Sequence, residues 1–372
     1  MILLLAALLL TTAVCVVGGY AAWLLTAPRP RAQRAAAHEL PHVLIVVPVF
    51  DEAALIERKL ENLAALTYAP KSVVLVDGGS SDGSVERIAR WIDGRDDFAL
   101  LATNLRDKTA QINEALRVHR GAEWILATDA DALLAPNALD ELVAVAASDA
   151  SIGVVGTRVR PASAHALEAL HWRATDWLRE RESARGSAGI VAAPCYLARR
   201  ALLADLPSDT IADDVHVACR AMSEGLRVGH GATLVVELRS PRTLRALLRH
   251  KYRKADAYLR EIFRFLPRAR QLPAVFLWRA ALLTLVPLLA TLAGVALVVD
   301  AAQRAYATDA AALLTIALAF ALLFTARPLR HAARFAALAF LLIAVSAAAL
   351  LAYPWSRQIA SFPKILSSDE LS

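Results

Sequence analysis

Two aspartates, Asp129 and Asp131, lie one residue apart where the apolar run WILAT (124–128) ends. Side chains at positions i and i+2 of an extended chain point to the same side, so both carboxylates can face one cation. Mg²⁺ and Mn²⁺ prefer oxygen ligands and keep coordination positions open for substrate phosphates. The pair therefore predicts a site for a divalent metal and a phosphate. A solvated turn, in which an aspartate caps a helix that begins near Pro136, is the structural alternative.

A second pair of acids, Asp213 and Asp214, directly precedes a predicted amphipathic helix. The apolar face of that helix consists of Val215, Ala218, Cys219, Met222 and Leu226. Negative charge at a helix N-terminus suits the helix dipole, which is a structural reason for one of the two acids. Two adjacent carboxylates suggest a second role, and we interpret one of them as a candidate general base.

A glycine-rich turn, VDGGSSDG (76–83), follows another apolar run. Its glycines allow close approach of a ligand to the backbone. Asp77, at the end of the predicted strand, can accept hydrogen bonds from a base or a ribose. Capping of the following helix by the serines and Asp82 is the structural alternative.

Strands and helices alternate in the part of the chain that carries these acids. Four apolar runs predict buried strands: 42–50, 73–76, 98–101 and 124–128. Three stretches between them have helical spacing: 53–63, 85–92 and 109–118. This alternation predicts an α/β fold with a mostly parallel, doubly wound sheet. Ligands bind beyond the carboxyl ends of such strands, so the acidic residues that follow the strands should converge there.

Membrane-spanning segments are predicted at both ends of the chain. The sequence is 57% hydrophobic with a mean hydropathy of +0.44, and its first 25 residues carry no charge. Basic residues follow this first segment rather than precede it, which favours an uncleaved anchor over a cleaved signal peptide. Three further spans are predicted at about 274–299, 310–326 and 335–353. Arg279, near the start of its span, is expected to reach the interface.

Basic residues concentrate from Arg242 to Arg270, immediately before an apolar span. Although a pI of 9.4 can indicate nucleic-acid binding, this placement favours anionic headgroups or a phosphate-bearing substrate at a membrane surface. No nucleic-acid partner is therefore expected. The distribution of positive charge predicts a multi-pass protein of the cell (inner or plasma) membrane, with the α/β domain and a loop at 327–334 in the cytoplasm.

These patterns divide the chain into five predicted parts. They are an anchor (1–26), an α/β domain (41–240), basic amphipathic interfacial helices (241–272), three transmembrane helices (274–353) and a tail (354–372). Three cysteines have no spacing typical of metal ligands, and they favour a reducing compartment for the middle domain.

The motifs, in this order, resemble those of the membrane-bound family 2 glycosyltransferases, a large inverting family with the GT-A fold. That family includes ceramide glucosyltransferase and polysaccharide synthases. The resemblance covers about residues 41–260. It rests on PVFDE (48–52), DGGSSDG (77–83), KTAQINEAL (108–116), the DxD-like pair, the Asp213–Asp214 pair and Arg253. Departures from the family pattern are Phe50, Asp51, Gly78, His250 for a glutamine and Lys254 for a tryptophan.

The resemblance implies a role for each matched residue. Asp214 would be the catalytic base, with Asp213 beside it and Arg253 stabilising the leaving diphosphate. Asp131 would bind Mg²⁺ or Mn²⁺, and Asp129 would serve both the metal and the nucleotide ribose. Asp77 would contact the nucleobase. The other substrate-binding residues would be Pro48, Val49, Glu52, Gly79, Lys108, Asn113 and His250.

The function that the resemblance implies is transfer of a sugar, with inversion, from a nucleotide-diphosphate sugar to an acceptor. We expect a UDP-linked donor and a membrane lipid or lipid-linked acceptor, because the basic helix leads directly into membrane spans. A processive polysaccharide synthase is the alternative within the family. A non-catalytic membrane scaffold is an alternative of another class, and a transporter is not indicated because the spans lack ionisable residues deep inside them.

Overall fold

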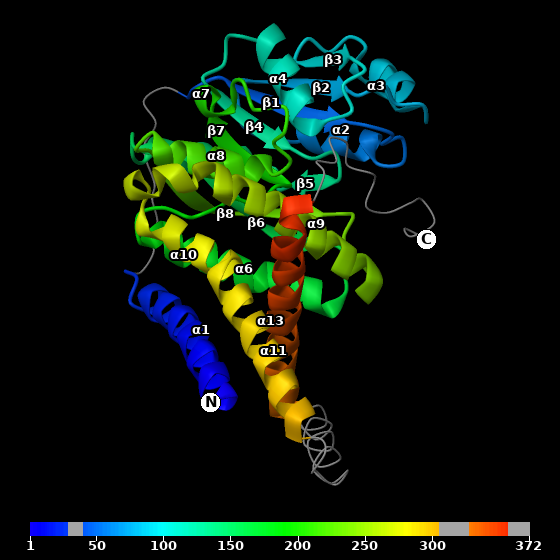
Figure 1. The fold of residues 1–372 in the computed structure, drawn as a ribbon. Helices are drawn as coiled ribbons and strands as arrows, with labels where there is room; N and C mark the ends of the chain where they lie inside the picture. The colour runs from blue at the N-terminus through cyan, green and yellow to red at the C-terminus, as the bar shows by residue number, and fades with distance from the viewer. Residues whose placement is uncertain (29–39, 305–326, 356–372) are drawn as a thin grey trace.

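The computed structural model describes residues 1–28, 40–304 and 327–355, and the sheet lies at one end of the molecule (Figure 1). Within these residues eight strands form one sheet in the order β3-β2-β1-β4-β7-β6-β8-β5. The strands are β1 (Val43–Val49), β2 (Lys71–Asp77), β3 (Phe98–Ala102), β4 (Trp124–Thr128), β5 (Ala132–Leu134), β6 (Ile152–Pro161), β7 (Cys195–Arg199) and β8 (Arg227–Glu237).

The first half of the sheet is parallel, as predicted, and the second half is mixed. β1 pairs in parallel with β2 and β4, and β2 pairs in parallel with β3. β7 is antiparallel to both β4 and β6, β6 is parallel to β8, and β8 is antiparallel to β5. The antiparallel pairing of β5 with β8 places the turn after β4 beside the end of β8, so two distant segments meet at one edge of the site.

Helices cover both faces of the sheet. One face packs against α2 (Ile56–Ala64), α3 (Ser84–Ile92) and α5 (Ala138–Ala147). The other face packs against α4 (Lys108–Val118), α7 (Arg200–Leu203), α8 (Asp213–Ser223), α9 (Leu244–Phe265) and α10 (Ala274–Leu283). α6 (Ala166–Ala184) packs on β6 and β8, and a 3₁₀ turn, η1 (Leu266–Gln271), follows α9. The predicted α/β class is confirmed.

Two helix boundaries differ from the predicted ones. Ala53 was expected inside the first helix, but α2 begins at Ile56, because the backbone N–H groups of residues 51–53 are bound by side chains of the 80–84 turn. Leu226 was expected on the α8 face, but α8 ends at Ser223 and a turn at Gly225, with a φ of 75°, redirects the chain into β8.

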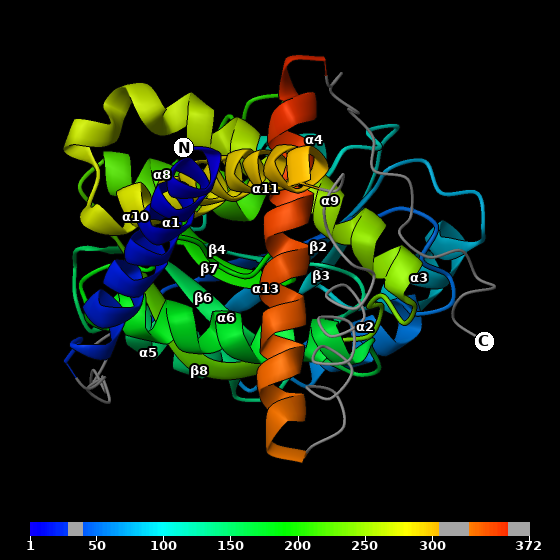
Figure 2. The same cartoon turned by 60° about the horizontal axis from the view of Figure 1, so that its bottom comes forward.

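Three of the described helices are long and apolar enough to cross a membrane: α1 (Ile2–Leu25), the segment Ala274–Ala301 and the segment Arg334–Trp355. They extend away from the sheet on the same side of the molecule (Figures 1 and 2).

The predicted span at 274–299 is two helices, α10 and α11 (Leu285–Arg304), which are separated at Thr284. The predicted loop at 327–334 is wrong, because these residues are the first turns of α13 (Arg327–Ala352). The predicted span at 310–326 lies outside the described residues.

A buried carboxylate joins the α/β domain to two of the apolar helices. Glu182, on α6, has an exposure of 0% and accepts hydrogen bonds from Tyr20 of α1 and from Arg279 of α10, the latter at 2.7 and 3.0 Å. It also accepts the backbone N–H of Gly189 at 3.0 Å. Arg279, expected to reach the interface, is therefore engaged in an ion pair with the domain.

We expect Glu182→Ala to destabilise the whole molecule, because it leaves the guanidinium of Arg279 buried without its partner. The loss should be roughly 3–5 kcal/mol, as for other buried ion pairs that lose one member. Thermal unfolding of the detergent-solubilised chain measures it. Glu61→Ala, at an exposed position of α2, is the matched control and should unfold like the wild type. Equal midpoints for the two variants would contradict the role of Glu182.

Candidate active site

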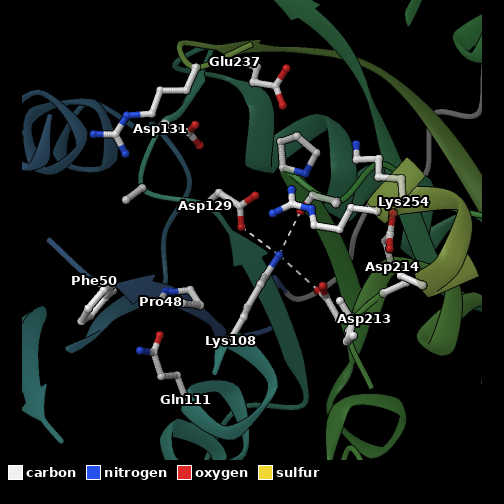
Figure 3. A pocket seen from close by; sticks show the side chains of 18 of the residues that line it. Pro48, Phe50, Lys108, Gln111, Asp129, Asp131, Asp213, Asp214, Glu237 and Lys254 are labelled. Carbon is white, nitrogen blue, oxygen red and sulfur yellow. Dashed lines mark hydrogen bonds and ion pairs between the residues drawn. The ribbon is translucent and has the colours of Figure 1, made fainter. Parts of the chain in front are cut away.

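A cavity of 310 Å³ lies beyond the carboxyl ends of the central strands. Its walls come from the end of β1, the turn after β4, the end of β8 and the pocket-facing side of α9, together with the first residues of α4 and α8 (Figure 3). Among the predicted site residues, those that line it are Pro48, Val49, Glu52, Lys108, Asp129, Asp131, Asp213, Asp214, His250 and Arg253. Residues far apart in the sequence therefore converge on one site, as the strand ends predicted.

Lys108 bridges the two pairs of acids. Its Nζ lies 2.8 Å from Oδ1 of Asp129 and 3.2 Å from Oδ2 of Asp213, and it donates a longer hydrogen bond of 3.3 Å to the carbonyl of Ala193 (Figure 3). Burial opposes the charged form of Lys108, but the charges of Asp129 and Asp213 outweigh it and raise the pKa of the ammonium group. Lys108 is therefore a fixed cation between the two acidic pairs.

The two acids at the start of α8 have different hydrogen-bond partners. Asp213 accepts the hydroxyl of Tyr196, from β7, at 2.6 Å, in addition to the Lys108 contact. Asp214 accepts the hydroxyl of Tyr258, from α9, at 3.1 Å. Burial and the neighbouring charge of Asp213 raise the pKa of Asp214. The raised pKa gives Asp214 a greater tendency to take a proton than an ordinary aspartate has.

Asp131 lies at the other side of the cavity, beside the end of β8. Glu237 is paired in register with Ala132, and the backbone N–H of Leu238 donates to the carbonyl of Asp131 at 2.9 Å. Burial, followed by the charges of Asp129, Glu237 and Glu52, raises the pKa of Asp131. Burial also raises the pKa of Glu237 to about 6.

This donor set fits a divalent cation that keeps water and phosphate ligands. The carboxylates of Asp129 and Asp131 are hard oxygen donors on one turn, and a cation beside them would relieve the unfavourable burial of Asp131. In the part of the chain that the structure describes, no group of three or more His, Cys, Asp or Glu residues is arranged to hold an ion.

Glu52, at the end of the loop after β1, forms an ion pair with Arg239, which follows β8. Both side chains are largely buried and line the cavity. The pair therefore ties the parallel half of the sheet to the mixed half across the mouth of the site.

The pocket-facing side of α9 carries cations. Arg253 and Lys254 line the cavity about one helical turn before Tyr258, and His250 lines it about one turn earlier still. Burial and the charges of the neighbouring lysines lower the pKa of His250 well below its usual value, so its imidazole is neutral at pH 7. The ammonium of Lys254 lies 5.1 Å from the centre of the Trp172 ring.

Three predicted substrate-binding residues do not line the cavity. The carboxylate of Asp77 is engaged by its own turn, where it accepts the N–H groups of Gly79 and Ser80 at 2.8 and 3.0 Å and the Ser80 hydroxyl at 2.5 Å. The amide of Asn113 is paired with the backbone of Leu206 at 2.8 and 2.9 Å. Asp77 and Gly79 thus shape the turn after β2, and direct substrate contacts from these three residues stay predictions.

Several polar residues of the site, Arg106 and Gln111 among them, were not predicted from the sequence. Tyr196 and Tyr258 bind the acids of α8, and Glu237 and Arg239 complete the wall near Asp131. Glu237 ends a strand, as the predicted acids do, and the same strand-end argument would have found it. No comparable sequence pattern marks the two tyrosines, because a tyrosine in a buried strand or an amphipathic helix is ordinarily predicted to be a core residue.

Comparison with known proteins identifies the class. Residues 44–206 match the family model described as Glycosyl transferase family 2. The mannosyltransferase PcManGT from Pyrobaculum calidifontis, solved with GDP-Man and Mn²⁺, is 25% identical and superposes with a TM-score of 0.75 over 95% of this chain and 99% of that chain. The protein is therefore a glycosyltransferase with the GT-A fold. Residues 44–206 are similar to a family 2 domain, and the same chain has three described helices that are long and apolar enough to cross a membrane.

Two other solved structures show only partial similarity. GalNAc-T7 with UDP, GalNAc and Mn²⁺ is 12% identical, with a TM-score of 0.46 over 62% of this chain and 51% of that chain. TarS of S. aureus is 17% identical, with a TM-score of 0.39 over 59% of this chain and 39% of that chain. A search among curated proteins found no significant match.

We expect Lys108→Met to lower both stability and activity, because Asp129 and Asp213 then face each other without the cation between them. The loss of stability should be about 1–3 kcal/mol, as for partly buried charged groups that lose a partner. Chemical denaturation of the purified chain measures it. Adding Asp129→Asn to Lys108→Met removes the repulsion and should restore part of the stability. No recovery in the double variant would contradict the bridging role.

Proposed function

We propose that the protein transfers a sugar from a nucleotide-diphosphate sugar to a hydroxyl group of a membrane lipid or lipid-linked acceptor, with inversion at the anomeric carbon. The observation that supports this most directly is the position of Asp214. It lines the cavity opposite the acidic pair, and its partner Tyr258 lies on α9, the helix that leads to the membrane-spanning segments.

Asp214 has the features of a general base. Its carboxylate is buried, its pKa is raised, and it accepts a hydrogen bond from the hydroxyl of Tyr258, which can reorient when a proton is taken up. In the proposed reaction Asp214 takes the proton of the acceptor hydroxyl as its oxygen bonds to the anomeric carbon. The bond from that carbon to the diphosphate breaks on the opposite face. Asp213 is held beside it by Lys108 and Tyr196.

The donor diphosphate is proposed to lie over the Asp129–Asp131 turn, between that turn and α9. A Mg²⁺ or Mn²⁺ ion held by Asp131 and Asp129 would neutralise negative charge that develops on the leaving group. Arg253, on the cavity wall, would add a second positive charge there. Asp129 would contact the ribose, and His250, Pro48, Val49 and Glu52 would form the surrounding wall.

We propose a membrane acceptor because the helix that supplies Arg253 and Tyr258 is continuous, through η1, with the apolar segment that begins at Ala274. The positive charge of residues 242–270 favours a cytoplasmic α/β domain at the cell membrane. Single transfer rather than processive synthesis is proposed because Lys254 stands where the processive enzymes of the family have a tryptophan.

A donor screen with product analysis tests the proposed function. Membranes that contain the protein would be incubated with labelled UDP-glucose, UDP-GlcNAc and GDP-mannose and a lipid extract. GDP-mannose is included because PcManGT was solved with it. We expect one donor to give a single glycolipid in mass spectrometry. A ladder or polymer would instead favour a processive synthase, and no transfer with any donor would contradict the proposal.

We expect Asp214→Asn to lower kcat by about 10²–10⁴-fold, the usual contribution of a general base, while donor binding is kept. Transfer assays and titration with the donor measure the two quantities. Asp96→Asn, an exposed aspartate in the turn after α3, is the control and should behave like the wild type. Unchanged transfer by Asp214→Asn would exclude Asp214 as the base and would favour a different catalytic residue.

The acid limb of the pH–rate profile should lie above the ordinary range of an aspartate. Because the raised pKa of Asp214 keeps the base protonated at low pH, activity is lost as the pH falls through that value. The hydroxyl of Tyr258 stabilises the charged form, so Tyr258→Phe should move the limb upward by about one pH unit or less. Tyr68→Phe, remote from the cavity, should not move it. A downward shift with Tyr258→Phe would contradict the assignment.

A further inference from the structure

Lys59 is a fully buried lysine on the face of α2 that packs against the sheet. Its exposure is 0%, and its neighbours on this face, Ile56, Leu60 and Leu63, are apolar and equally buried. Burial lowers the pKa of Lys59 to about 8, against the favourable charges nearby. Because an unbranched apolar side chain would fill the same volume at lower cost, a lysine here needs a physical reason.

The contacts of Lys59 flank the acidic turn. Its Nζ donates to Oγ1 of Thr128, the last residue of β4, at 2.9 Å, and to the carbonyl of Ala132, the first residue of β5, at 2.5 Å. Only Asp129, Ala130 and Asp131 lie between these two residues. One ammonium group therefore joins both ends of the turn that carries the acidic pair.

Charge provides a second connection between Lys59 and the pair. Asp129 and Asp131 both favour the charged form of Lys59, so the ammonium group lies close enough to interact with both carboxylates. Asp129 has a second cation in Lys108. Asp131 has a second cation nearby in Arg239, whereas Lys59 adds hydrogen bonds to both ends of the turn.

We propose that Lys59 is a positioning residue for the acidic pair, whose ammonium fixes both ends of the 129–131 turn and offsets part of its charge so that the carboxylates are held ready for a divalent cation. Lys59 is not part of the cavity wall and acts only through the turn. The inference rests on the proposed function, because it requires that Asp131 and Asp129 bind the cation that accompanies the donor diphosphate.

The test is Mn²⁺ binding to the full, detergent-solubilised chain without donor, followed by the electron paramagnetic resonance signal of free Mn²⁺. We expect Lys59→Met to weaken Mn²⁺ binding by about 10-fold or more, the usual effect of losing a group that orients metal ligands. Its thermal midpoint should equal or exceed that of the wild type, because methionine fills the space without a buried charge. The Mn²⁺ concentration for half-maximal transfer should rise more than kcat falls.

Asn62 supplies the matched control. It lies one turn after Lys59 on α2 and binds the other end of β5, with hydrogen bonds of 2.7 and 2.9 Å to the backbone of Leu134. Asn62→Leu should therefore keep wild-type Mn²⁺ affinity. Equal weakening by Asn62→Leu and Lys59→Met would mean that α2 acts only by docking on β5, and unchanged or tighter binding in Lys59→Met would also overturn the proposal.

Two further variants keep the outcome decisive. Thr128→Val removes one hydrogen-bond acceptor of the Lys59 ammonium group but leaves the positive charge of Lys59 in place. It should therefore weaken Mn²⁺ binding, but by less than Lys59→Met does. If Lys59→Met does not fold, wild-type Mn²⁺ affinity in Thr128→Val would overturn the proposal. Asp131→Asn tests the metal site itself. If Asp131→Asn binds Mn²⁺ as tightly as the wild type, the metal role in the proposed function is refuted. If Asp131→Asn loses Mn²⁺ binding while Lys59→Met binds Mn²⁺ like the wild type, only the inference about Lys59 is refuted.

Discussion

The ion bridge of Lys108 with Asp129 and Asp213 is the interaction on which the geometry of the site depends. Its three members come from the start of α4, the turn after β4 and the start of α8, so a single ammonium group fixes the relative positions of three elements. The positive charge of Lys108 also allows the Asp129–Asp131 pair and the Asp213–Asp214 pair to lie close together, although their negative charges repel each other. Asp131 and Asp214, the members that Lys108 does not contact, are left on the two sides of the cavity with raised pKa values.

The parallel half of the fold could be predicted from the sequence, and the mixed half could not. The strands at 43–49, 71–77, 98–102 and 124–128 are continuous apolar runs separated by amphipathic helices, so local patterns define them. β5 has three residues, and its place beside β8 depends on pairing across about 100 residues, which no local pattern records. The break between α10 and α11 could not be predicted either, because the length of an apolar stretch can be read from the sequence but the position of a bend within it cannot.

Most of the cavity-lining acids could be predicted, because acids that follow buried strands or begin a helix are conspicuous in a sequence. The partners that tune them could not. Tyr258 contacts Asp214 only because α9 returns to the sheet 44 residues later, and Arg239 meets Glu52 over 187 residues. The strand-end position of Asp77 predicts hydrogen bonds to a base or a ribose, and that contact stays a prediction. Whether a carboxylate faces a cavity or its own turn depends on side-chain geometry that the sequence does not contain.

The turn after β2 also limits how this sequence can change. The family pattern that this turn resembles has a second aspartate at the position of Gly78. A Cβ atom there would lie 2.6 Å from the carbonyl oxygen of Leu105 and against the amide of Gln111. Gln111 is held in that place by its bond of 2.6 Å to the same carbonyl. A single substitution at position 78 therefore cannot restore the aspartate without displacing backbone. A side chain at position 78 should consequently occur in related sequences only together with changes both at position 111 and in the loop that carries the carbonyl of Leu105.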